Sequence, residues 1–106
     1  MIHEDERRLL IDVPHPNVDG HRLKIIISKD SNVVLGKHYH KKKTEVFQAL
    51  VGNIWIERDR YNEKMIQGVT YNVNPMVIHT FVLDKGAIML CNVDQEYDPN
   101  DDYAVD

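Results

Sequence analysis

One stretch decides the fold expected for this chain: Gly36-Lys37-His38-Tyr39-His40-Lys41-Lys42-Lys43-Thr44-Glu45. His38 and His40 are two residues apart, so in an extended strand both imidazoles point to the same face. Glu45 follows a short run of lysines and opens an apolar stretch, and a hairpin there would bring its carboxylate beside the histidines. Two nitrogens and one oxygen that converge on one point suit a divalent transition metal. His79 is the candidate for a fourth ligand.

Most of the remaining chain consists of short β-prone runs separated by turn signals. We predict strands at residues 9–13, 23–28, 33–40, 45–51, 54–58, 65–66, 69–73, 77–83 and 87–93. Gly52-Asn53 predicts a tight hairpin between two of these strands, and the polar stretch 59–64 predicts a turn. Because no helical period is present, the pattern predicts an all-β barrel or sandwich.

Length and composition indicate one globular domain over residues 1–106. The net charge of −4 and the pI of about 5.8 argue against nucleic acid as a partner. The lone Cys91 cannot form an internal disulfide, which suits a reducing compartment, and we expect its thiol to be buried and inert. No apolar run approaches the roughly 20 residues that span a bilayer, and the acidic N-terminus lacks a signal-peptide core. We therefore expect a cytoplasmic protein without a membrane partner.

The spacing of the first motif resembles that of a known family. His38-x-His40, four residues, Glu45, six residues and then Gly52 is similar to the first conserved motif of the cupins. Asn32 stands where that motif usually begins with glycine.

A second, more divergent match follows. Gly68, the turn at Asn74-Pro75 and His79 resemble the layout of the second cupin motif. The chain departs from this motif at the proline position, where it has Asn74, at the turn glycine, where it has Met76, and at the asparagine, where it has Leu83.

The resemblance implies a single-domain jelly-roll β-barrel of the RmlC-like cupin superfamily, with a motif core over residues 32–83 and an acidic C-terminal arm over 94–106. It also implies a divalent transition metal in the barrel mouth, whether Zn, Fe, Ni, Mn or Cu, held by three histidines and one glutamate. The ligands carried over are His38, His40, Glu45 and His79. Phe47 and Ala49 follow Glu45 on the same strand face, and we predict that they line the pocket with Phe81.

A weaker resemblance connects the chain to nucleotide-sugar 3,4-ketoisomerases of cupin type. Gly36 to Lys41 is similar to their glycine-x-His-x-His-Lys signature, and Tyr97 to Tyr103 is similar to their C-terminal segment. In that group the two histidines transfer protons and glutamine usually takes the place of Glu45. The glutamate therefore favours a metal cupin.

We expect a metal-dependent isomerase, epimerase or oxygenase that acts on a small oxygen-rich molecule such as a carbohydrate or keto acid, with His38, His40 and Glu45 as catalytic residues. Two alternatives remain: a non-catalytic ligand-binding or sensing cupin, and a metal-independent ketoisomerase that uses His38 and His40 for proton transfer. Lys41 to Lys43 could hold an anion, but we expect a solvated turn.

We also expect a homodimer, because exposed strand edges must be covered. The runs Leu9 to Val13 and Leu23 to Ile27 are the candidates for pairing across the two-fold axis.

Overall fold

The computed structural model describes residues 1–105, which form eleven strands and one short 3-10 helix. The elements are β1 (Ile2–Glu4), β2 (Arg8–Pro14), β3 (Arg22–Ser28), β4 (Val33–Tyr39), β5 (Glu45–Val51), β6 (Ile54–Arg58), β7 (Tyr61–Lys64), β8 (Tyr71–Val73), β9 (His79–Leu83), β10 (Ile88–Val93), η1 (Pro99–Asp101) and β11 (Tyr103–Ala104). None of the helical structure in this part of the chain is long and apolar enough to cross a membrane.

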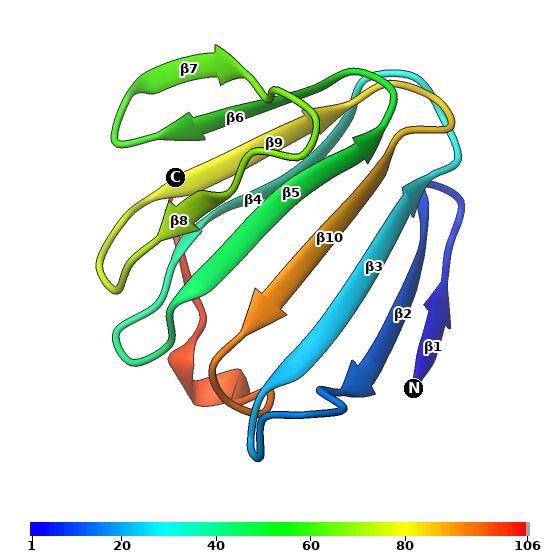
Figure 1. The fold of residues 1–106 in the computed structure, drawn as a ribbon. Coiled ribbons are helices and arrows are strands. Elements are labelled where there is room, and N and C mark those ends of the chain that lie inside the picture. Colours follow the sequence, from blue (N-terminus) through cyan, green and yellow to red (C-terminus); the bar gives the residue numbers. More distant parts are fainter. Residues whose placement is uncertain (106) are drawn as a thin grey trace.

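The strands form two antiparallel sheets (Figure 1). One has the order β1-β2-β3-β10-β5-β8 and the other the order β11-β4-β9-β6-β7. The predicted all-β jelly roll is confirmed. Each sheet turns one face inward, and residues two apart along a strand share that face.

The core lies between the sheets, and most of its buried polar side chains, namely His40, Lys43, Glu45, His79 and Asp101, lie close together. The largest fully buried side chains are Ile54, Ile56, Leu83, Met89, His79, Val73, Val93, Asp101 and Cys91. Full burial of one such aliphatic side chain contributes about 1.5–3 kcal/mol, so the apolar members stabilise the barrel around the polar ones.

A β-bulge in β4 turns the two histidines of the first motif inward. Leu35 faces the core, and simple alternation from it would point Lys37 inward and both His38 and His40 outward. The pairing of β4 with β9 shifts by one residue between Gly36 and His38, and Gly36 and Lys37 both have positive φ, at 95° and 66°. The extra residue reverses the alternation, so His38 and His40 face the barrel interior.

The predicted hairpin at Gly52-Asn53 is wrong. These residues connect β5 in one sheet to β6 in the other, and the two strands do not pair with each other. Gly52 has φ of 78°, and a Cβ there would lie 3.0 Å from the Cα of Ala87. The glycine therefore marks a close crossing between sheets instead of a two-residue hairpin.

The prediction of a turn over 59–64 followed by a strand at 65–66 is also wrong. Strand β7 occupies Tyr61–Lys64 and pairs with β6 through the two-residue turn Asp59-Arg60. Both turn residues have positive φ, as the tight hairpin turn requires, although neither is glycine. Met65 and Ile66 follow the strand, and Met65 packs into the core.

The two runs proposed for pairing across a dimer axis are not free edges. Strand β2 pairs with β1 and β3, and β3 pairs with β2 and β10. The short strand β1 was not predicted and covers the outer edge of β2. Any dimer contact made by these strands must therefore use their faces.

Candidate metal centre

Three histidines gather at one place in the barrel. His38 lies in β4, His40 follows that strand directly, and His79 begins β9. One nitrogen from each of the three rings lies within 4.8 Å of the others. His38 and His79 are partners in the register of β4 and β9, so strand pairing itself positions two of the three.

Glu45, the first residue of β5, brings a carboxylate to the same point. Its Oε1 lies 3.2 Å from His40 Nε2 and 3.5 Å from His79 Nε2. His40 Nε2 and Glu45 Oε1 are both buried, and neither makes a hydrogen bond among the described residues. Buried polar atoms are rarely left without a partner, because losing water costs about 1–3 kcal/mol for each group. A cation would satisfy both atoms, so this set of nitrogen and oxygen donors fits a divalent metal.

Backbone contacts fix which nitrogen of two rings faces the site. His40 Nδ1 lies 2.6 Å from the carbonyl oxygen of Asp101, and His79 Nδ1 lies 3.0 Å from that of Val77. A carbonyl oxygen only accepts, so each Nδ1 carries the proton and donates. The Nε2 lone pairs are left to point at Glu45, as metal-ligating histidines require.

The C-terminal arm holds the turn at Lys41 to Lys43, which connects His40 to Glu45. The carboxylate of Asp101 accepts backbone N–H groups from Lys41 at 2.7 Å, Lys42 at 3.2 Å and Lys43 at 3.3 Å. Burial raises the pKa of Asp101, but these three donors outweigh burial, and the pKa is lowered. The carboxylate therefore clamps the turn that joins His40 to Glu45.

No protein-family model and no curated protein matches the sequence. Solved structures match it across its whole length. CapF, a capsular polysaccharide assembling protein from Staphylococcus aureus, has a TM-score of 0.83 and 21% identity over 100% of this chain and 32% of that chain. A cupin-2 domain protein from Rhodospirillum rubrum has a TM-score of 0.80 and 13% identity over 100% of this chain and 74% of that chain. The chain has the cupin fold.

Oxalate decarboxylase from Bacillus subtilis is another neighbour, with a TM-score of 0.80 and 15% identity over 99% of this chain and 30% of that chain. The present chain spans about a third of the length of CapF. The neighbours include enzymes, and the histidine cluster of this chain could hold a metal ion.

The solvated turn expected at Lys41 to Lys43 is confirmed for Lys41 and Lys42 and is wrong for Lys43. Lys41 and Lys42 are exposed, whereas the side chain of Lys43 is 7% exposed and its Nζ lies 4.0 Å from Glu45 Oε2. The turn curls around Asp101, which carries the third lysine inward. Sequence alone gave no sign of this, because the residue responsible is 58 positions away.

Burial and neighbouring charges shift the pKa values of three of the four candidate ligands. Burial lowers the pKa of His38 to about 4; the neighbouring His79 lowers it further, and Asp102 partly offsets both. Burial also lowers the pKa of His79. Burial raises the pKa of Glu45, but contact with His40 and the positive charge of Lys43 outweigh burial and bring it to about 2. At neutral pH His38 and His79 are therefore neutral and Glu45 is a carboxylate, the forms in which these groups bind a metal.

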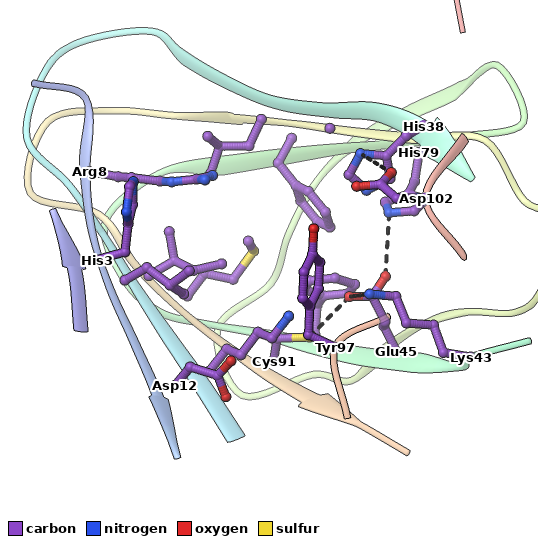
Figure 2. A pocket seen from close by; sticks show the side chains of 18 of the residues that line it. His3, Arg8, Asp12, His38, Lys43, Glu45, His79, Cys91, Tyr97 and Asp102 are labelled. Atoms are coloured by element: carbon purple, nitrogen blue, oxygen red, sulfur yellow. Dashed lines mark hydrogen bonds and ion pairs between the residues drawn. The ribbon is translucent and has the colours of Figure 1, made fainter. Parts of the chain in front are cut away.

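A cavity of about 440 Å³ adjoins the cluster. Phe47 and Phe81 line it as predicted, whereas Ala49 is fully buried and is not among the described residues that line it. Figure 2 shows Glu45 and His79 gathered on one side of this cavity. Cys91 is buried as predicted; burial, followed by the charge of Glu45, raises the pKa of its thiol.

Proposed function

We propose that this cupin binds a divalent transition metal and acts as an isomerase or epimerase on a small oxygen-rich molecule, such as a carbohydrate or keto acid. The observation that carries the proposal is the convergence of His38, His40, His79 and Glu45 beside a cavity. Two buried atoms of this set, on His40 and Glu45, make no hydrogen bond within residues 1–105. These four residues would hold the metal. Imidazole and carboxylate donors suit Zn, Fe, Ni, Mn and Cu.

The ligand we propose carries two oxygens on neighbouring carbons. One CapF structure contains the inhibitor 3-isopropenyl-tropolone, and oxalate decarboxylase is named for oxalate. Both compounds have two oxygens on adjacent carbons. The same arrangement occurs in hydroxy-ketones and 2-keto acids, which are substrates of isomerases that move a proton next to a carbonyl.

A bound metal would supply Lewis-acid polarisation of the ligand's carbonyl group. His38 is the most accessible of the three histidines: its side chain is 28% exposed, compared with 4% for His40 and 1% for His79. Its ring therefore lies where the ligand enters. Phe47 and Phe81 supply the apolar wall that excludes water from the reacting atoms.

In the metal-independent alternative, His38 and His40 would transfer protons. One imidazole nitrogen cannot hold a metal and a proton together, because both use the same lone pair. A general base works best when its pKa is near the working pH, and the pKa of about 4 makes His38 a weak base at neutrality. The proton on His40 Nδ1 is held by the Asp101 carbonyl. Both points favour the metal.

Cobalt substitution tests the ligand assignment directly. We expect acetoin, with oxygens on adjacent carbons, to shift the visible bands of the cobalt-loaded protein, and 4-hydroxy-2-butanone, with one carbon more between them, to leave the bands unchanged. If neither tropolone nor any hydroxy-ketone shifts the bands, the metal is structural.

Hydrogen exchange separates an enzyme from a binding module. In heavy water, the enzyme should catalyse loss of the C–H signal next to the ligand's carbonyl, chelation should stop the loss, and added metal should restore it. Exchange that survives chelation would support the ketoisomerase alternative. A metal-loaded protein that binds the ligand without exchange would support the sensing module.

A further inference from the structure

Arg8 is a cation that lines the cavity. It lies at the start of β2, on the same face as Leu10 and Asp12, and all three line the cavity. Figure 2 shows Arg8 and His3 on the side of the cavity away from Glu45. Among residues 1–105, the Arg8 guanidinium makes no ion pair within 4.0 Å, and its Nε is buried without a hydrogen bond.

Other arginines of the chain have their charge or their N–H groups satisfied. Arg22 pairs with Asp12 at 3.0 Å, and Arg58 pairs with Glu63 at 2.9 Å. Arg7, the neighbour of Arg8, is exposed and donates to the Val34 carbonyl at 3.4 Å. A guanidinium cannot lose its proton, and a partly buried charge without a partner is costly. Within the described part of the chain, Arg8 therefore lacks the counter-charge that a partly buried cation needs.

The cavity lining contains both positively and negatively charged side chains. Three of the lining side chains are carboxylates. Asp12 faces Arg22 and Glu45 faces Lys43, whereas Asp102 lies beside the neutral His38 at the metal-binding side of the cavity (Figure 2). Lys24 of β3 also lines the cavity, and its Nζ lies 6.0 Å from the centre of the Tyr97 ring, with no carboxylate within 4.0 Å among the described residues. Arg8 and Lys24 therefore carry the two lining side-chain positive charges that have no carboxylate within 4.0 Å among residues 1–105.

We propose that Arg8, supported by Lys24, forms an oxyanion subsite for a carboxylate or phosphate group of the ligand. A guanidinium offers parallel N–H donors that match both groups. The subsite stands apart from the histidines, so one ligand can place its anionic group at Arg8 and its adjacent oxygens at the cluster; only this second half rests on the proposed function.

The cavity size limits the ligand. At about 30 Å³ for each water, the 440 Å³ cavity holds roughly 15 waters, which corresponds to a monosaccharide-sized acid or phosphate. A nucleotide sugar would extend well outside it. The ligand class is therefore a small sugar acid, keto acid or sugar phosphate.

Titration calorimetry with inorganic phosphate and with pyruvate, on the protein as purified and after chelation, tests the subsite. Arg8→Gln should weaken binding of the preferred anion by about 10- to 100-fold, the range for hydrogen bonds to charged groups. Arg7→Gln changes the net charge equally and should have no effect. The anion affinity of Arg8→Lys should lie between those of the wild type and Arg8→Gln. This variant keeps the test valid if Arg8→Gln does not fold. The anion that binds more tightly shows whether the subsite prefers a phosphate or a carboxylate group.

Equal anion binding by wild type, Arg8→Gln and Arg8→Lys would overturn the subsite, as would equal losses in Arg7→Gln and Arg8→Gln. Measurement of metal uptake distinguishes failure of the subsite from failure of the proposed function. Arg8→Gln should take up metal as the wild type does. An Arg8-dependent anion effect in a protein that binds no metal would keep the subsite and remove the metal-dependent function.

Discussion

At the scale of single residues, Gly36 allows the β-bulge that turns His38 and His40 inward. Its φ is 95°, and a Cβ there would lie 2.8 Å from the His79 carbonyl oxygen, a contact with backbone that cannot move aside. Gly36→Ala should therefore displace the bulge, lower metal affinity and cost about 1–3 kcal/mol of stability. Gly68→Ala is the matched control, because Gly68 has φ of 83° with open space around it. Equal metal affinities in the two variants, measured by competition with a chelator, would contradict this role.

The histidine pKa values predict how stability depends on pH in the metal-free protein. The folded-state pKa of His38 is about 4, below its usual 6.5, so the unfolded chain binds protons that the folded chain does not. Stability should fall as the pH drops from 6.5 towards 4. Glu45, with its pKa lowered to about 2, adds a loss below 4.5. Urea midpoints between pH 7.5 and 4.5 measure the first effect, and His38→Asn should reduce it; a flat profile for the wild type would be evidence against it.

At the scale of elements, the short helix η1 acts as a clamp on the metal-binding loop. Asp101 accepts three backbone N–H groups through its carboxylate and the His40 Nδ1–H through its carbonyl. Asp101→Ala should lower metal affinity by about 10- to 100-fold, as losses of outer-sphere support do. Asp101→Asn should restore part of it, because the amide oxygen still accepts. Asp19→Ala, in an exposed turn, is the control; a loss of the same size there would exclude the clamp.

Strands that the local sequence marks could be predicted, whereas features that depend on contacts between distant residues could not. Strands β5 and β6 have the predicted bounds, because branched and aromatic residues mark them locally. Strand β7 was missed because its turn, Asp59-Arg60, lacks glycine. The four metal-ligand candidates could be named from spacing, whereas Asp101, Arg8 and the burial of Lys43 depend on long-range contacts that leave no periodic signal.

At the scale of the whole molecule, the outer face of the larger sheet is suited to a second copy of the chain. Leu9, Ile11, Ile25 and Ile27 are half-buried on neighbouring strands, and Ile25 is the register partner of Ile11. A two-fold interface joins identical patches, and an aliphatic patch is complementary to itself. We propose a homodimer through this face. Light scattering should give about twice 12.4 kDa, and Ile25→Lys should halve the mass. A wild-type monomer at micromolar concentration would contradict the proposal.

Elemental analysis of the purified protein tests the central claim most directly. The convergence of His38, His40, His79 and Glu45 predicts about one divalent transition metal per chain. His40→Ala should lose the metal while the fold remains, and His21→Ala, a histidine outside the cluster, should keep it. Wild-type protein from metal-replete medium that contains no metal, and takes up none on titration, would contradict the account.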